Sequence, residues 1–172
     1  AQLSRGLGDV YKRQALGSNL PANYVSSVDL LHAAIAAIAA ARVRVVAVSS
    51  FYRTRPFGPS QPDYVNLVLK VNTVLGARGL LHEMQGVEAA FGRAREVKWG
   101  PRTLDIDLIS MPAGRSGPDP VLPHREMHRR GFVLYPLCEI APGWRHPVSG
   151  RPICQLIGGL PPVERAGITR IM

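Results

Sequence analysis

Three segments of the chain alternate between apolar and polar or small residues with the period of a β-strand. They run from Arg42 to Arg53, from Tyr64 to Thr73 and from Leu104 to Ile109. Successive side chains of a strand point to opposite faces, so this alternation predicts strands that differ in burial between their faces. A further strand is expected to end within Ala15 to Asn19, where a glycine and an asparagine favour a turn.

Helical periodicity predicts helices at about Tyr24 to Ala41 and Arg78 to Phe91, a mostly helical segment from Glu126 to Ile140, and a short helix near Ile153 to Ile157. In each longer helix the apolar residues recur three and four positions apart, which places them on one face. Gly131 and Pro136 are expected to interrupt the third segment. Proline and glycine mark 54–63 and 113–123 as loops, and 92–101 is a charged loop.

The order strand, helix, strand, strand, helix, strand predicts an α+β fold in which helices pack against an antiparallel sheet. No repeat or flexible linker divides the chain, so 15–172 are expected to form a single domain. Residues 1–14 show neither period. They have the character of an atypical, foreign or poorly determined lead-in, and most of them are left out of this fold assignment.

Composition is that of an ordinary globular protein: 172 residues, 46% hydrophobic and 19% charged. The apolar segment Leu30 to Ala41 is too short to cross a bilayer, and no export signal precedes it. Cys138 and Cys154 lack the spacing of a metal site, and a disulfide is not expected. We therefore expect a cytoplasmic protein without a membrane partner, with a monomer as the default state.

The formal net charge of +9 has three interpretations. It indicates a nucleic-acid-binding face, an arginine-rich composition without functional meaning, or a polyanionic small substrate. The arginines gather at Arg93, Arg95 and Arg102 and again at Arg125, Arg129 and Arg130. Two clusters in place of one long stripe favour a pocket for a few phosphates, with no nucleic-acid partner.

Asp105 and Asp107 lie two positions apart in the third strand, so their carboxylates share one face, roughly 7 Å apart. Such carboxylates repel each other unless a cation lies between them, and Mg²⁺ prefers carboxylates, waters and substrate phosphates. The alternative is solvated charge on an edge strand. The apolar run around the pair instead indicates a buried central strand, so we favour a metal site.

The arginine-rich loop before this strand suits a triphosphate. Arg93, Arg95 and Arg102 supply planar cations that pair with phosphate, and Gly92 and Gly100 let the loop close. The chain has no glycine-rich phosphate loop of the Walker or kinase type. A nucleotide would therefore be held by side chains and metal ions.

Aromatic and amide side chains suggest a site for a flat heterocycle. Tyr64 and Asn66 share one face of a strand, which offers ring stacking beside an amide that reads hydrogen bonds. Trp99 and Phe132 are further candidates, although aromatic residues are more often part of a core. His124 precedes a helical segment near several arginines and is a candidate phosphate contact.

Several ordered motifs now resemble those of the 6-hydroxymethyl-7,8-dihydropterin pyrophosphokinase family. They are Ala15-Leu16-Gly17-Ser18-Asn19-Leu20, Ser50-Phe51-Tyr52-Arg53-Thr54, Gln61-Pro62-Asp63-Tyr64-Val65-Asn66, Trp99-Gly100-Pro101-Arg102-Thr103-Leu104-Asp105-Ile106-Asp107, and Pro123-His124 with Arg130-Gly131-Phe132. The resemblance extends from about Ala15 to Leu160, and the motif that begins at Trp99 is highly specific.

The resemblance implies a ferredoxin-like fold and one step of folate biosynthesis, in which ATP donates its terminal diphosphate to the pterin hydroxymethyl group and AMP is released. It implies that Asp105 and Asp107 hold two Mg²⁺ ions and that Arg93 and Arg102 serve catalysis. Gln85, Glu88, Arg95, Trp99, His124 and Arg130 would line the ATP site. Thr54, Phe57, Tyr64, Asn66 and Phe132 would bind the reduced pterin.

Two other functions stay open at this point. A metal-dependent glycosyltransferase or nucleotidyltransferase also uses an Asp-x-Asp pair, but it would release a nucleoside diphosphate or pyrophosphate. A basic RNA-binding domain would show a steep salt dependence and would tolerate loss of the aspartates.

Overall fold

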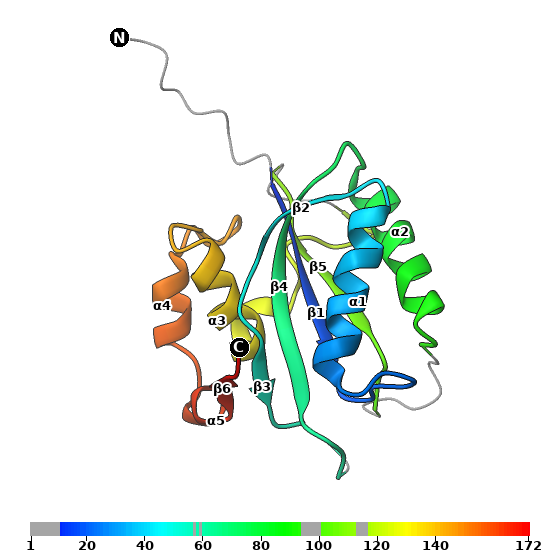
Figure 1. Cartoon of the computed structure of the whole chain (residues 1–172). Helices are drawn as coiled ribbons and strands as arrows, with labels where there is room; N and C mark the ends of the chain where they lie inside the picture. The colour runs from blue at the N-terminus through cyan, green and yellow to red at the C-terminus, as the bar shows by residue number, and fades with distance from the viewer. Residues whose placement is uncertain (1–10, 57, 59, 94–100, 113–116) are drawn as a thin grey trace.

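The computed structural model describes residues 11–56, 58, 60–93, 101–112 and 117–172. Its centre is an antiparallel sheet with the strand order β5-β1-β4-β3-β6, and β2 also pairs with β4 (Figure 1). The strands are β1 (Lys12–Ser18), β2 (Arg44–Val48), β3 (Tyr52–Thr54), β4 (Tyr64–Asn72), β5 (Asp105–Ser110) and β6 (Ile168–Arg170).

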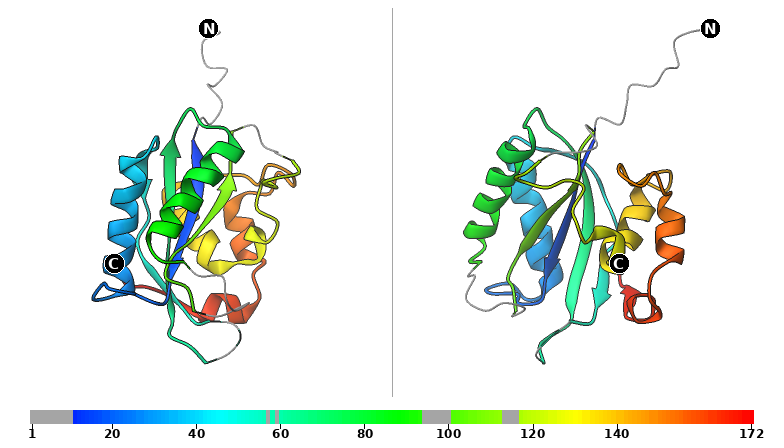
Figure 2. Two further views of the ribbon diagram at one scale, coloured as in Figure 1. Left: turned by 90° about the vertical axis from the view of Figure 1, so that its right-hand side faces the viewer. Right: turned by 180° about the vertical axis from the view of Figure 1, so that it is seen from behind.

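Helices cover both faces of the sheet, as Figure 2 shows from two further sides. On one face α1 (Ser27–Ala40) and α2 (Ala77–Ala90) bury an apolar cluster that includes Leu31, Leu67 and Met84. On the other face α3 (Gly131–Ile140) and α4 (Ile153–Gly158) cover a second cluster, which includes Val68 and Leu134. The short helix α5 (Pro162–Ala166) leads into β6, and a 3₁₀ turn at Met127–Arg129 precedes α3.

This arrangement confirms the predicted α+β fold. From β1 to β5 the element order is strand, helix, strand, strand, helix, strand when β2 and β3 are counted as one interrupted strand, which is the ferredoxin-like order. The helices expected near 24–41, 78–91 and 153–157 are all present, with shifted ends. The first begins at Ser27 because the Ser26 hydroxyl caps it by accepting a hydrogen bond from the Asp29 amide (3.1 Å).

The strand predicted from Arg42 to Arg53 is divided into β2 and β3, so that prediction was wrong in its continuity. Ser49 lies in the gap. Its backbone amide donates to the Val68 carbonyl (3.0 Å), while its hydroxyl accepts from the Val68 amide (2.9 Å). One serine thus makes contacts that two strand residues would make, and the chain turns there. The alternation of apolar and polar residues does not reveal where a side-chain hydroxyl takes the place of a backbone carbonyl in strand pairing.

The third helical segment also differs from expectation. Gly131 is the first residue of α3 and so does not interrupt a helix that had already begun. Pro136 lies inside α3 without ending it. Proline has no amide hydrogen, so the helix loses one backbone hydrogen bond at this position. Burial of the surrounding apolar face compensates for the loss of that bond.

The first strand begins at Lys12, so residues 12–14 belong to the sheet although the sequence assigned them to the lead-in. Burial of β1 between β4 and β5 overrides the polar character of Lys12, Arg13 and Gln14. Strand β5 was predicted to be central, but it forms an edge of the described sheet. Ile106 and Leu108 are buried there because α2 packs against them.

Candidate active site

The candidate site lies on the face of the sheet that α3 covers, where β5, β1 and β4 form one row. Asp105 pairs with Gly17 of β1, and Gly17 pairs with Asn66 of β4. Residues directly opposite one another in antiparallel strands point to the same face. The predicted metal-binding carboxylate and the predicted pterin-binding amide therefore lie on one surface, separated by a glycine.

Gly17 lies between Asp105 and Asn66 and leaves room on this surface for the Asn66 side chain. A Cβ at this position would lie 2.7 Å from Asn66 Oδ1 and 3.8 Å from the Tyr64 ring. Asn66 Nδ2 donates to Thr54 Oγ1 (2.7 Å), which fixes the orientation of the amide. Since Asn66 is only 6% exposed, its orientation is set by the protein before any ligand arrives. Three of the five predicted pterin contacts, Thr54, Tyr64 and Asn66, are thus brought together.

Asp105 lies between two guanidinium groups. Arg93 contacts its Oδ1 (2.9 Å), and Arg102 donates to its Oδ2 (2.7 Å). Burial acts to lower the pKa of Arg102, but the neighbouring Asp105 carboxylate outweighs it and raises that pKa. Both predicted catalytic arginines therefore converge on the first carboxylate.

Asp107 has a different environment. Its Oδ2 lies 3.8 Å from Arg130 and 4.0 Å from His124 Nε2. Burial raises the pKa of Asp107, and the charge of Asp105 raises it further. This carboxylate therefore gains most from an additional positive charge, which is the electrostatic requirement of a metal site.

His124 presents a hydrogen-bond donor to that carboxylate. Burial lowers the pKa of His124, which favours the neutral ring. Its Nδ1 accepts from the Glu126 amide (3.2 Å), so in the neutral ring the proton is on Nε2, on the side of Asp107. The His124 amide donates to the Ile109 carbonyl (2.9 Å), and this bond holds the residue beside β5.

Glu88 reaches the same site from α2. Its carboxylate accepts from the Ile106 amide (2.7 Å) and is paired with Arg93. Burial raises the pKa of Glu88, which is 3% exposed. Glu88 thus holds Arg93 beside Asp105, and its place in the ATP site, which the family resemblance implies, stays a prediction. Gln85, also expected at the nucleotide, is exposed on α2.

Sequence patterns did not identify Asn19 as a site residue, although Asn19 lies in the family motif from Ala15 to Leu20. Asn19 Oδ1 accepts from the Arg102 amide (2.9 Å), and Nδ2 donates to Gln61 Oε1 and to the Pro62 carbonyl (both 2.9 Å). The buried side chain therefore ties Arg102 to the loop before β4. The glycine and asparagine at this strand end were interpreted only as a turn, and the partners of Asn19 are 42 to 83 positions away.

Arg130 and Phe132 flank the first residue of α3. The Arg130 guanidinium lies 5.6 Å from the centre of the Phe132 ring and also near Asp107. Phe132 is half-buried against the second core cluster. The start of α3 therefore brings one predicted nucleotide contact and one predicted pterin contact to the carboxylate face.

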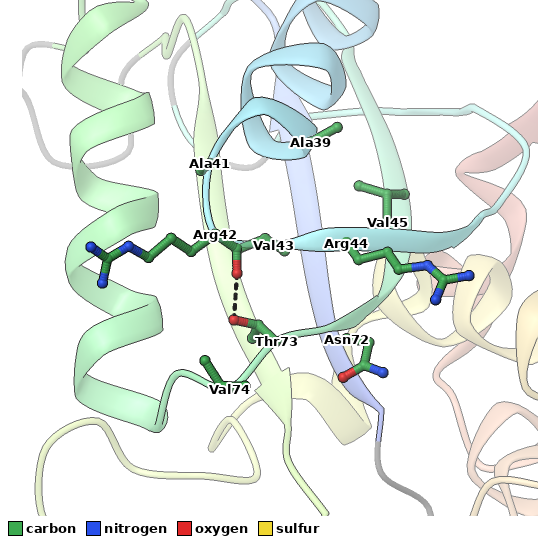
Figure 3. Close-up of a pocket in the computed structure, with 9 residues that line it drawn as sticks. All are labelled: Ala39, Ala41, Arg42, Val43, Arg44, Val45, Asn72, Thr73 and Val74. Carbon is green, nitrogen blue, oxygen red and sulfur yellow. Dashed lines mark hydrogen bonds between the residues drawn. The ribbon is translucent and has the colours of Figure 1, made fainter.

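Three predicted site residues, Phe57, Arg95 and Trp99, lie outside the described residues. A separate hollow of about 600 Å³ lies at the opposite end of β4, beside Asn72 and Thr73. Figure 3 shows Arg42 and Arg44 pointing away from each other there. That hollow lacks the convergent polar groups of the carboxylate face, and it is not the candidate site.

The donor set of the carboxylate face fits Mg²⁺. Asp105 and Asp107 supply hard oxygen ligands, and among the described residues no group of three or more His, Cys, Asp or Glu side chains is placed to hold a metal. An ion held by two carboxylates needs waters and phosphate oxygens to complete its coordination, as is usual for Mg²⁺ in phosphoryl transfer.

In the described part of the chain, no helix has the length and apolar character needed to span a membrane.

Comparisons with known proteins show the family to which the chain is similar. The model of the family described as 7,8-dihydro-6-hydroxymethylpterin-pyrophosphokinase matches residues 14–142. A Synechocystis protein named 2-amino-4-hydroxy-6-hydroxymethyldihydropteridine pyrophosphokinase is 46% identical over 135 residues, covering 75% of this chain and 67% of that protein. A Haemophilus influenzae protein of the same name is 45% identical over 130 residues, covering 74% of this chain and 79% of that protein.

Solved structures support the fold. A crystal structure of a Plasmodium falciparum HPPK-DHPS triple mutant has a TM-score of 0.70 at 13% identity and covers 94% of this chain. The wild-type form of that protein with pterin and p-hydroxybenzoate gives 0.68 at 14% identity. This chain spans 45% and 46% of those two chains, less than half of each. On the family match and the two close relatives, the chain belongs to the 7,8-dihydro-6-hydroxymethylpterin-pyrophosphokinase family.

Proposed function

We propose that this protein transfers the terminal diphosphate of ATP, as a unit, to the hydroxymethyl oxygen of 6-hydroxymethyl-7,8-dihydropterin and releases AMP, a step of folate biosynthesis. The observation that carries the proposal is the row Asp105, Gly17, Asn66, which places a metal-type carboxylate beside a preoriented amide. Family membership supports the same reaction.

The nucleotide half of the site is proposed to contain Asp105 and Asp107 as ligands of two Mg²⁺ ions. When bound, these ions would neutralise and orient the triphosphate. Arg93 and Arg102 pair with Asp105, and in the proposed complex their guanidinium groups would bind phosphate oxygens. Arg130 and His124 offer further donors beside Asp107. With these groups, Gln85, Glu88, Arg95 and Trp99 complete the proposed nucleotide site.

The pterin half is proposed to use the donors and acceptors of Asn66, with Thr54 fixing its amide. The backbone near Thr54 and Phe57 would read the same edge of the heterocycle, and Tyr64 and Phe132 would hold its two faces. Burial raises the pKa of Tyr64, so its hydroxyl stays protonated at neutral pH. This keeps the ring uncharged beside Asp105.

The proposed reaction needs orientation more than acid–base chemistry. The hydroxymethyl oxygen attacks the β-phosphorus and forms the new P–O bond as the bond from that phosphorus to the α,β-bridging oxygen breaks. That oxygen leaves with AMP, and the hydroxyl proton is released to solvent. Fixed cations at Arg93, Arg102 and Arg130 would stabilise charge on the transferring group, the main contribution of protein groups to phosphoryl transfer.

The direct test is to incubate the protein with ATP, Mg²⁺ and the reduced pterin and to separate the nucleotide products. We expect AMP only when pterin is present. Asp105→Ala and Asp107→Ala should each abolish turnover, while Asp29→Ala, which removes a carboxylate on the far side of the sheet, should retain it.

Other products would identify other functions. ADP would indicate transfer of a single phosphoryl group, and free pyrophosphate would indicate a nucleotidyltransferase. A glycosyltransferase would release a nucleoside diphosphate only when a nucleotide sugar is supplied as the donor. Near-normal rates in either aspartate variant would refute the metal assignment. RNA binding that survives loss of both aspartates and weakens steeply with salt would favour the nucleic-acid alternative.

A further inference from the structure

The C-terminal segment formed by α5 and β6 lies against both walls of the proposed pterin site. The family match ends at residue 142, so this segment, from Pro162 to Arg170, lies beyond it. Figure 1 shows α5 and β6 beside β3 and below α3. The contacts described next come from two separate surfaces of this one segment.

The first contact is with β3, the strand that carries Thr54. Strand β6 pairs with β3 in antiparallel register, with Ile168 opposite Thr54 and Arg170 opposite Tyr52. The pairing continues past β6, since the Ile171 amide donates to the Phe51 carbonyl (2.9 Å). Thr54 in turn holds the Asn66 amide, so β6 supports the wall that reads the edge of the pterin.

The second contact is with the start of α3. The Gly131 amide donates to Glu164 Oε2 (3.1 Å), and the N-cap residue Arg130 makes no side-chain capping bond. Glu164 therefore supplies from another helix the carboxylate that a helix N-terminus favours. Gly131 lies between Arg130 and Phe132 in the chain. A hydrogen bond that holds the Gly131 backbone in place therefore also helps to position these two predicted ligand contacts.

Gly131 leaves no free space at this contact. A Cβ there would lie 2.8 Å from the Glu164 carbonyl oxygen and would also collide with Ile168 Cδ1. Because one of these atoms belongs to the backbone, a side chain at 131 would push α3 away from α5. The helix start is thus held at a fixed distance from the same segment that pairs with β3.

We propose that α5 and β6 brace the pterin pocket and that Glu164 is a positioning residue, which sets the place of Phe132 and Arg130 through the Gly131 amide. This inference rests on the function proposed above. Glu164 does not touch substrate in this role. It fixes the separation between Thr54, at the edge of the proposed ring site, and Phe132, at one face of that site.

Steady-state kinetics of the full chain test the proposal. Glu164→Ala should raise the KM for pterin about tenfold, the factor expected for loss of one charge-assisted hydrogen bond, and should lower kcat by a smaller factor because Arg130 shifts together with Phe132. Glu164→Gln keeps an acceptor oxygen and should restore most of the affinity. Arg165→Ala, an exposed neighbour on the same short helix, should match the wild type. Gly131→Ala should resemble Glu164→Ala.

Two further readouts separate positioning from mere stability. The Gly131 amide should exchange with solvent about tenfold faster in Glu164→Ala than in the wild type or Arg165→Ala, without any substrate present. In a Phe132→Ala background, Glu164→Ala should raise the pterin KM by a smaller factor, because the group it positions is gone. Thermal melting of each variant checks that the protein is folded.

The brace is overturned if the Gly131 exchange rate is unchanged in Glu164→Ala, if Arg165→Ala shifts the pterin KM equally, or if the factor is the same with and without Phe132. A wild-type protein that releases no AMP with pterin would instead contradict the proposed function. The amide-exchange measurement still decides the contact in that case, so the two failures are distinguishable.

Discussion

At the scale of single residues, the absence of a side chain at Gly17 permits the proposed site to form. Asp105 and Asn66 flank this glycine in one row of the sheet, and a Cβ would press on Asn66 Oδ1. The displaced amide would lose its bond to Thr54. Gly17 is required here because a Cβ at this position would come too close to the Asn66 side chain.

Gly17→Ala should therefore raise the KM for pterin about fivefold or more, the factor that corresponds to the loss of a hydrogen bond worth about 1 kcal/mol. The KM for ATP should change little. Gly86→Ala is the matched control, because a Cβ there meets nothing within 4 Å. Equal pterin KM values in Gly17→Ala and the wild type would show that Asn66 does not bind pterin in this orientation.

Arg102 makes the second prediction at this scale. Arg102→Ala should lower kcat by about 10³, as for other arginines that stabilise phosphoryl transfer. Its pair with Asp105 is about one-third exposed on the arginine side, so the free energy of unfolding should change by less than about 1 kcal/mol. Single-turnover kinetics with urea unfolding of the same variant would separate the two effects, and a loss of rate that merely follows unfolding would contradict the catalytic role.

At the scale of elements, β1 combines a central position with polar residues. Gln14 is fully buried, and neither side-chain polar atom has a hydrogen-bond partner within the described ranges. It pairs with Leu69 on one side and Leu108 on the other. Buried polar groups without partners lower the free energy of unfolding. A substitution that removes such a group from β1 should therefore stabilise the protein.

Gln14→Leu should raise the free energy of unfolding by about 2 kcal/mol, since it removes an unpartnered amide from an apolar layer. The urea midpoint should increase with an unchanged m-value. Gln155→Leu on the exposed side of α4 should stay within about 0.5 kcal/mol of the wild type. A midpoint that falls in Gln14→Leu would mean that the amide has a partner in solution.

At the scale of the whole molecule, Glu139 joins the end of α3 to the break between β2 and β3. Its carboxylate accepts from the Ser50 amide (2.8 Å), the Ser50 hydroxyl (2.9 Å) and the Tyr52 hydroxyl (2.6 Å). Burial acts to raise the pKa of Glu139, but these hydrogen bonds outweigh it and lower that pKa. Burial, with the bond to Glu139, raises the pKa of Tyr52 to about 12.

The lowered pKa fixes the sign of a pH dependence. Below the ordinary glutamate value of 4.5 the unfolded chain binds a proton before the folded protein does, so the stability that Glu139 contributes is lost as pH falls. Glu139→Gln should be less stable than the wild type at neutral pH, and the difference should shrink below about pH 4.5. Urea unfolding from pH 7 to pH 3 measures it, and a difference that grows in acid would have the wrong sign.

How much the sequence predicts depends on the range of the interactions involved. The aspartate strand and the helices follow from local periodicity, and the motifs around Asp105 and Asn66 indicated the site. Three hydrogen bonds join residues that are 19 to 83 positions apart. They link Ser49 to Val68, Asn19 to Arg102 and Glu164 to Gly131. Those contacts arise from tertiary packing, and periodicity does not contain them.

The most direct test is a crystal structure with Mg²⁺, a non-hydrolysable ATP analogue and the reduced pterin. We expect metal density between the phosphates and the carboxylates of Asp105 and Asp107, with Arg93 and Arg102 turned from Asp105 to phosphate oxygens and the pterin on Asn66. A structure in which both arginines still pair with Asp105 and no ion lies at either carboxylate would contradict the proposed chemistry.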